Sequence, residues 1–295
     1  MFKRKVEPLI DDFFKIYRYI DKIDKGFYST VYTVQHVISN DKYALKLLSE
    51  SHYDSSCLNN NSKQDDIKYH WFKEYEIVQK LNHPNIIKID QIFKVRWNNM
   101  IKNCLLLEYV PGKTLQKYIL AHGPIVNLDE FNKIIKQLLS ALNYIFNQGI
   151  VHRDIKSENI MYHDGLIKLI DFGLANYYRT PPSSEYKPID LSKKAGTVLY
   201  MAPELIFSLI FDLQQLPKCD IWSLGVVSYY IISGKLPFVA PTLLEFKNVI
   251  MTGIYTPIEN IDKSIEYLIS KCLVINAVDR FDIDQLLMIY MQKNQ

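Results

Sequence analysis

Three polar residues within residues 150–173, the stretch IVHRDIKSENIMYHDGLIKLIDFG, have the types and spacing of a metal site with a nearby base. Asp154, Asn159 and Asp171 lie beside apolar, strand-like runs, where a carboxylate costs desolvation free energy unless something binds it. Mg²⁺ prefers carboxylate and amide oxygens, and phosphate oxygens and water usually complete its coordination. Asn159 and Asp171 are therefore candidate metal ligands, and Asp154 is a candidate base.

The same stretch resembles the catalytic loop and the metal-binding loop of eukaryotic protein kinases. The residues that carry the resemblance are His152-Arg153-Asp154, Lys156, Asn159 and Asp171-Phe172-Gly173. Either fragment alone would suit a chance aspartate on a turn or at a hairpin tip, but the two occur in the family's order and spacing. The resemblance covers about residues 17–290. It implies an α+β, bilobal protein-kinase fold, with a small antiparallel β-sheet lobe that has one main helix and a larger, mainly helical lobe.

The resemblance also divides the chain. Residues 1–16 are expected to be an N-terminal extension, residues 17–109 the small lobe (N-lobe) and residues 110–295 the large lobe (C-lobe). Residues 50–68 (ESHYDSSCLNNNSKQDDIK) are polar and low in complexity, so we expect a flexible loop there. Residues 171–204 match the activation segment, which ends in Ala-Pro-Glu.

The secondary structure that must position these residues is predicted from composition and periodicity. Strands are predicted at residues 17–23, 30–37, 42–48, 86–93 and 103–109. Helices are predicted from about Asp65 to His83, over residues 128–148, and from Asp220 to near Gly234. In the second helix an apolar stripe marks a buried core face, Asn127 and Glu130 favour a capping-box-like start, and Gly149 ends it.

The first two strands and Gly26 resemble the glycine-rich loop that covers the ATP phosphates. The family pattern has three glycines, of which only the middle one, Gly26, is retained; Asp24 and Ser29 occupy the other two positions. A carboxylate close to a polyphosphate would weaken ATP binding by Coulomb repulsion. We favour the alternative, in which Asp24 is an ordinary turn residue that faces water.

The resemblance assigns the site residues one by one. Lys46 matches the lysine that contacts the α- and β-phosphates, and Glu74 matches its glutamate partner; the alternatives are an exposed strand lysine and a solvated helix glutamate. The catalytic set is Asp154, Lys156, Lys46 and Glu74. The ATP-binding set is Ile23, Gly26, Val31, Ala44, Lys46, Leu107, Glu108, Val110, Met161 and Asp171. Asn159 and Asp171 are the expected Mg²⁺ ligands, and Glu204 is expected to pair with Arg280.

The implied activity is transfer of the γ-phosphoryl group of ATP to Ser/Thr hydroxyls of protein substrates. Lys156 and Thr197 resemble Ser/Thr rather than Tyr kinases, and residues 196–204 resemble the calcium/calmodulin-dependent kinase group. Two alternatives stay open: a pseudokinase that acts as a signalling scaffold, suggested by Asp24 and Ser29, and a kinase-fold enzyme for small molecules. Arg153 suggests control by a phosphate at Ser192, added by an upstream kinase or by autophosphorylation; the alternatives are that Ser183 or Ser184 is used, or that no serine of this segment is.

Composition bears on the partners and the cellular compartment of the protein. The chain has 35 Lys and Arg against 32 Asp and Glu, a net charge of +3, which does not call for a nucleic-acid partner. No apolar run approaches the roughly 18 residues of a membrane helix, and the basic N-terminus has no apolar signal region. The cysteines are scattered without a CxxC pair and predict reduced thiols in a cytoplasmic or nuclear protein.

Overall fold

The computed structural model describes residues 8–10, 12–26, 29–48, 71–179, 197–207 and 212–291. The chain divides into two compact units, which we call the sheet unit (Met1–Asn82 and Ile87–Val110) and the helical unit (His83–Ile86 and Pro111–Gln295). A mostly antiparallel sheet with one main helix forms the first, and helices dominate the second. The expected α+β, bilobal fold is confirmed. The predicted loop at residues 50–68 lies outside the described residues.

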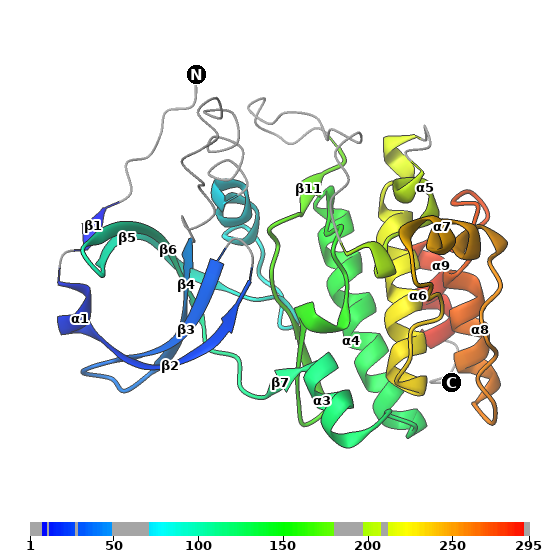
Figure 1. Ribbon diagram of the computed structural model, residues 1–295, viewed down its shortest axis with the longest axis horizontal. Coiled ribbons are helices and arrows are strands. Elements are labelled where there is room, and N and C mark those ends of the chain that lie inside the picture. Colours follow the sequence, from blue (N-terminus) through cyan, green and yellow to red (C-terminus); the bar gives the residue numbers. More distant parts are fainter. Residues whose placement is uncertain are drawn as a thin grey trace. The chain divides into compact units, whose positions relative to one another are not determined.

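The sheet unit contains one six-stranded sheet with the strand order β1-β5-β6-β4-β3-β2. Its strands are β1 (Leu9–Ile10), β2 (Tyr17–Lys25), β3 (Ser29–His36), β4 (Lys42–Leu48), β5 (Ile89–Trp97) and β6 (Met100–Glu108). All neighbouring pairs are antiparallel except β1 and β5. The short helix α1 (Phe13–Ile16) joins β1 to β2, and Figure 1 shows the sheet curling so that α1 lies between its two ends.

The register of β3, β4 and β6 gives the two faces of this sheet different tasks. Val31 lies opposite Lys46, and Ala44 lies opposite Leu107, so these four side chains share one face. The alternating residues project to the other face, where a hydrophobic core forms. That core contains Phe13, Tyr17, Val34, Leu45, Leu47, Phe93, Val95, Cys104 and Leu106. Residues 8–16 therefore complete the core of the sheet, which the sequence analysis did not predict.

The hairpin of β5 and β6 corrects the predicted strand limits. Strands were expected at residues 86–93 and 103–109, but β5 runs to Trp97 and β6 begins at Met100. The two-residue turn between them consists of Asn98 (φ 47°) and Asn99 (φ 61°), both in the left-handed region. Asparagine tolerates this conformation better than most residues, and such turns match the twist of a hairpin. The Asn-Asn pair was the turn signal that the analysis overlooked.

The main helix of the sheet unit is described over residues 71–78. Trp71, Ile77 and Val78 are buried on it, and Leu81 is buried just beyond it. The predicted start near Asp65 lies outside the described residues. The segment ends before His83-Pro84, where a proline disfavours further helix.

The helical unit is built around the two long helices α4 and α6, which lie side by side in Figure 1. Its helices are α3 (Leu115–His122), α4 (Leu128–Asn147), α5 (Pro203–Ile206), α6 (Pro217–Ser233), α7 (Leu243–Thr252), α8 (Lys263–Cys272) and α9 (Ile283–Met291). Short strands are β7 (Lys113–Thr114), β8 (Ile150–Val151), β9 (Ile160–His163), β10 (Leu166–Leu169) and β11 (Asn176–Tyr177). Single 3₁₀ turns are η1 (Ser157–Asn159), η2 (Val198–Tyr200) and η3 (Leu213–Gln215).

Local signals explain the limits of the two long helices. The Asn127 side chain accepts a hydrogen bond from Glu130 N at 2.9 Å and caps α4, and Gly149 follows the helix with φ 71°. The predicted apolar stripe of α4 is fully buried. Helix α6 begins at Pro217, three residues before the predicted Asp220, because proline suits the first helical turn. Across the described part of the chain, every helix falls short of the length or apolarity that a membrane span demands.

Candidate active site

The sheet unit holds a buried ion pair between strand β4 and the main helix. Lys46 Nζ donates to Glu74 Oε1 at 2.7 Å and to Oε2 at 2.9 Å, and both side chains are almost entirely removed from solvent. The Trp71 ring lies 5.8 Å from the same nitrogen, within cation–π range. Glu74 thus fixes the direction of the lysine, which is what a phosphate-binding lysine requires.

The register places several of the predicted nucleotide-binding residues around Lys46. Val31, Ala44 and Leu107 share its face of the sheet, as described above. Glu108, at the end of β6, is bound to Lys88 twice: its N donates to Lys88 O at 3.1 Å, and its Oε1 accepts from Lys88 N at 2.7 Å. The two bonds tether the last residue of β6 to the start of β5, and Val110 follows two residues later.

The hairpin of β2 and β3 carries Ile23, Asp24 and Gly26. Gly26 N donates to Ser29 O at 2.9 Å, which closes the hairpin end. Asp24 is exposed, and its Oδ1 accepts from Lys25 N at 2.7 Å. Ile23 is 42% exposed and lies at a register irregularity between Lys22 and Asp24. The Asp24 side chain faces water, as expected, but Asp24 is a residue of strand β2 opposite Val31 rather than a turn residue.

In the helical unit, two short sheets hold the catalytic-loop residues and the metal-binding-loop residues together. β8 pairs with β11, and β9 pairs with β10 and β7. Ile170 N donates to Asn159 O at 2.8 Å, which joins the two loops directly. Met161 lies on β9, partly buried. The sequence separation between Asn159 and Asp171 is thus bridged by one hairpin.

Asp154 is held by four hydrogen bonds. Its Oδ1 accepts from Thr197 N at 3.0 Å and Thr197 Oγ1 at 3.1 Å, and its Oδ2 accepts from Lys156 Nζ at 2.7 Å and Asn159 Nδ2 at 2.9 Å. Lys156 Nζ also donates to Thr197 Oγ1 at 2.7 Å. The structure therefore brings Asp154, Lys156, Asn159 and Thr197 into one cluster. A carboxylate fixed on both oxygens is well oriented to accept a proton from a bound hydroxyl.

Asn159 and Asp171 suit a hard divalent cation by their chemistry. The Asn159 amide nitrogen is committed to Asp154, because it donates to the main-chain O and to Oδ2, both at 2.9 Å, so the amide oxygen is turned away as the acceptor. Asp171 is exposed, has a positive φ of 64°, and lies two residues after the end of β10. One amide oxygen and one carboxylate are typical protein ligands of Mg²⁺ when phosphate oxygens and water supply the rest.

A buried aspartate on α6 supports the catalytic loop by accepting hydrogen bonds from its backbone. Asp220, in the first turn of α6, accepts from His152 N at 2.7 Å and from Arg153 N at 2.8 Å. Arg153 has φ 67°, a strained value for a non-glycine residue, and these bonds help to hold it. Burial raises the pKa of Asp220 to about 6, and the two backbone donors act in the opposite direction. From the sequence, Asp220 was identified only as the start of a helix. Its position next to the apolar pair Ile-Trp was the available signal of a buried carboxylate that needs hydrogen-bond donors.

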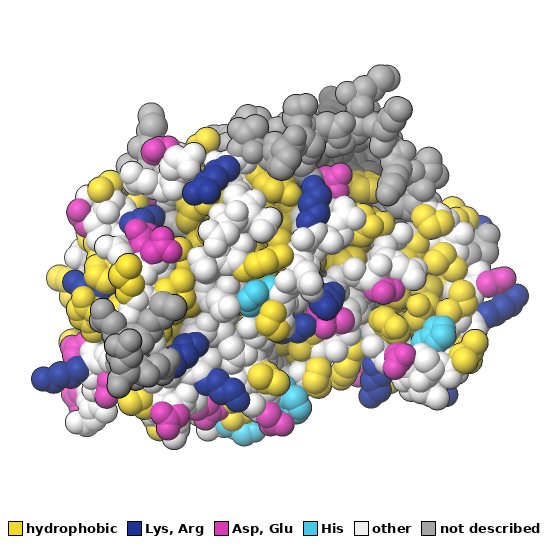
Figure 2. Space-filling view, turned by 180° about the vertical axis from the view of Figure 1, so that it is seen from behind, with side chains coloured by type: hydrophobic (Ala, Val, Ile, Leu, Met, Phe, Trp, Pro, Cys, Tyr) yellow, Lys and Arg dark blue, Asp and Glu magenta, His cyan; other side chains and the backbone are white. Residues whose placement is uncertain are grey.

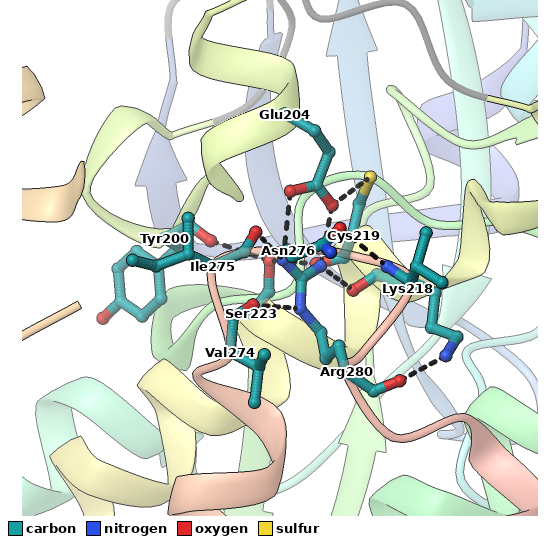
Figure 3. Close-up of polar contacts among 10 residues, drawn as sticks. Tyr200, Glu204, Lys218, Cys219, Ser223, Val274, Ile275, Asn276 and Arg280 are labelled. Atoms are coloured by element: carbon teal, nitrogen blue, oxygen red, sulfur yellow. Dashed lines mark hydrogen bonds and ion pairs between the residues drawn. The ribbon is translucent and has the colours of Figure 1, made fainter. Parts of the chain in front are cut away.

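Glu204 and Arg280 form the expected pair. Arg280 Nη1 and Nη2 donate to Glu204 Oε1 at 2.7 Å and Oε2 at 3.0 Å, and both residues are buried. Figure 3 shows the Arg280 guanidinium surrounded by further acceptors, which include Lys218 O and Val274 O. This fork fixes α5, which follows Thr197, to the segment before α9. Ser192, the candidate phosphorylation site, lies outside the described residues.

Comparisons with known proteins identify the family to which the chain belongs. The protein kinase domain family matches residues 17–290. Sperm motility kinase 2B of Mus musculus is 33% identical over 268 residues, which cover 90% of this chain and 50% of the relative. Sperm motility kinase 3A of Mus musculus is 32% identical over 276 residues, 92% of this chain and 49% of the relative. The chain thus spans about half the length of the curated relatives it matches. It belongs to the protein kinase domain family.

Proposed function

We propose that this chain is a protein serine/threonine kinase that uses ATP and Mg²⁺. The observation that carries the proposal is the cluster around Asp154, in which Lys156, Asn159 and Thr197 fix both carboxylate oxygens. Phosphoryl transfer needs positioning and charge neutralisation more than covalent chemistry. A set of oriented charges and amides of this kind is suited to that task.

Each residue has a proposed part. Asp154 accepts the proton of the substrate hydroxyl, and Lys156 steadies the γ-phosphate. Lys46, oriented by Glu74, binds the α- and β-phosphates. The nucleotide base is proposed to contact Val31, Ala44, Leu107 and Met161, and backbone groups of Glu108 and Val110, with Ile23 and Gly26 nearby.

Asn159 and Asp171 are the residues that would hold Mg²⁺. The bound cation supplies charge neutralisation of the phosphates in the transition state. The chain's own contribution is to hold the Asn159 amide in one orientation through Asp154, and to join the Asn159 and Asp171 loops through Ile170 N.

The preference for Ser/Thr acceptors and for protein substrates rests on Thr197 and Lys156, which bind each other and Asp154. A threonine at this position places a hydroxyl between the lysine and the base. Assignment to the calcium/calmodulin-dependent kinase group rests on the sequence of residues 196–204 alone. The three described cysteines are buried free thiols, which supports a reducing, cytoplasmic or nuclear location.

A peptide-array phosphorylation assay with Mg·ATP tests the proposal. We expect incorporation of phosphate into Ser/Thr peptides, and a loss of at least about a hundredfold in Asp154→Asn, which keeps the shape of the side chain but removes the base. The matched control is Asp164→Asn, an exposed aspartate after β9. Equal activity of Asp154→Asn and wild type would refute the role of Asp154, and phosphate on tyrosine alone would refute the acceptor preference.

The second candidate is a pseudokinase scaffold, favoured by Asp24 and Ser29 at two glycine positions. The exposed Asp24 side chain accepts a hydrogen bond from the adjacent Lys25 N, which lessens that argument. Measurement of ATP turnover separates the two candidates, because a scaffold binds nucleotide or partners without turnover.

We also propose that phosphate at Ser192, added by an upstream kinase or by autophosphorylation, activates the enzyme. A phosphate offers several acceptor oxygens that an arginine can meet with paired hydrogen bonds, and Arg153 is the proposed partner. Phosphatase treatment should lower activity several-fold, and Ser192→Ala should match the treated protein. Ser184→Ala is the control and should respond to phosphatase as wild type does. Full activity of completely dephosphorylated wild type would contradict the proposal.

A further inference from the structure

A chain of buried and partly buried side-chain hydrogen bonds links η1, in the catalytic loop, to η2, in the segment before α5. Ser157 is fully buried, and its Oγ lies 2.8 Å from the Tyr200 hydroxyl. The same Oγ donates to Glu158 Oε2 at 3.0 Å, and Gln116 Nε2 on α3 donates to Glu158 Oε1 at 3.0 Å. None of these bonds was used in the site described above.

The direction of the bonds follows from proton counting. A carboxylate only accepts hydrogen bonds, so the Ser157 hydroxyl must donate its single hydrogen bond to Glu158. Tyr200 must then be the donor to Ser157. Burial raises the pKa of Tyr200, which keeps its hydroxyl protonated for this task. The series of hydrogen bonds therefore runs from Tyr200 through Ser157 to Glu158, and consecutive hydrogen bonds of this kind strengthen one another.

Both ends of this chain are anchored. Tyr200 is bound at its main-chain O by Ser223 Oγ of α6 at 2.8 Å, and Figure 3 shows this contact. Glu158 is bound by Gln116 of α3 and precedes Asn159, which binds Asp154. Tyr200 lies three residues after Thr197, the other residue that binds Asp154. The two segments that hold Asp154 are thus tied to each other a second time, away from the carboxylate.

We propose that Ser157 and Tyr200 are positioning residues that lock residues 197–203 onto the catalytic loop and thereby set the placement of the acceptor hydroxyl at Asp154. This inference rests on the proposed function. The bond belongs to the helical unit alone, whereas Lys46 and Glu74 belong to the sheet unit. Its loss should therefore affect the peptide step and leave the ATP contacts of Lys46 unchanged.

The kinetic test uses Tyr200→Phe, Ser157→Ala and the double variant. Each single variant should lower kcat/KM for peptide about five- to tenfold, with KM for ATP within about twofold of wild type. The double variant should be no worse than Ser157→Ala, because Ser157→Ala already removes the Tyr200–Ser157 bond together with the Ser157–Glu158 bond. The matched controls are Tyr229→Phe and Ser228→Ala, whose buried hydroxyls bond Thr256 O and Leu224 O elsewhere in the unit. They should retain wild-type kinetics. Multiplicative losses in the double variant, or an equal rise in both KM values, would overturn the proposal.

A second readout needs no activity, so it separates this inference from the proposed function. Amide hydrogen exchange should quicken at residues 152–160 in Tyr200→Phe and at residues 197–203 in Ser157→Ala, each remote in sequence from its substitution. The two control variants should leave both segments unchanged. Unchanged exchange at both segments refutes the lock even if the enzyme is active. Quickened exchange in a protein without phosphotransfer would retain the lock and reject the kinase proposal instead.

Discussion

At the scale of single residues, His152 shows how burial sets a charge state beside the proposed base. It is fully buried and packs on Phe172 with 4.6 Å between ring centroids. Its Nδ1 accepts from Asp154 N at 3.3 Å, and among the described residues its Nε2 finds no hydrogen-bond partner. Burial lowers the pKa of His152 to about 4, although Asp154 and Asp171 act in the opposite direction.

This shift predicts a pH-dependent stability. The folded-state pKa lies below the unfolded value of 6.5, so between pH 6.5 and pH 4 the unfolded chain binds more protons. The contribution of His152 is therefore complete above pH 6.5 and is lost as pH falls towards 4, in total about 3 kcal/mol. Asp220 titrates with the opposite sign in part of this range, so only a comparison isolates His152.

Denaturant unfolding of wild type and His152→Phe at several pH values between 4 and 7 provides that comparison. The free energy of unfolding of the variant should fall less steeply towards acid, by up to about 1.4 kcal/mol per pH unit. His152→Gln serves if the phenylalanine variant does not fold. Parallel pH curves for wild type and variant would show that His152 keeps an ordinary pKa in the fold.

At the scale of elements, the buried Glu204–Arg280 ion pair predicts a large loss of stability when one partner is removed. Arg280→Met leaves the Glu204 carboxylate buried without its guanidinium, and three main-chain carbonyls lose a donor. Removal of one partner of a buried pair typically costs about 3–5 kcal/mol. Denaturation monitored for the helical unit should show this, whereas Asp164→Asn, at an exposed pair with His163, should cost less than about 1 kcal/mol. A small effect of Arg280→Met would mean that water replaces the fork.

The elements also show which features the sequence could predict. Periodicity located β4 and α4 closely, because one face of each is buried and the pattern has a fixed period. Motif spacing located Asp154 and Asn159, since one 3₁₀ turn joins them. Asp220 and the Tyr200–Ser157 bond depend on contacts between residues 43 to 68 positions apart, which no local pattern encodes. Helix α1 was missed because four residues are too few to show a period.

At the scale of the whole molecule, the small net charge does not call for a nucleic-acid partner. Figure 2 shows Lys and Arg interspersed with Asp and Glu over the face that it draws, in keeping with a net charge of +3. Recognition of an acidic polymer would require a one-signed surface. We propose that local groups contribute to selectivity, such as the Glu158 carboxylate that Gln116 and Ser157 orient. Such a carboxylate would favour peptides with basic residues upstream of the acceptor.

Nucleotide binding offers a prediction that involves both units. A ligand that binds only the folded state at a hundred times its Kd stabilises by about 2.7 kcal/mol. For a chain of this size that corresponds to a rise in Tm of roughly 4 °C. We expect Mg·ATP to raise the Tm of wild type by this amount. Lys46→Met and Asp171→Ala should each remove most of the rise, because each takes away a charge that we propose binds phosphate or metal.

The pattern of these shifts also decides between the two proposed functions. Asp171→Ala should abolish the extra rise that Mg²⁺ adds over ATP alone, while Lys46→Met should weaken binding with or without Mg²⁺. The control is Lys15→Met, at an exposed pair with Asp12, which should respond as wild type does. A full rise in Tm without phosphate transfer to any peptide would favour the scaffold, since binding would be intact and chemistry absent. Equal rises in all four proteins would place the nucleotide away from Lys46 and Asp171 and refute the site.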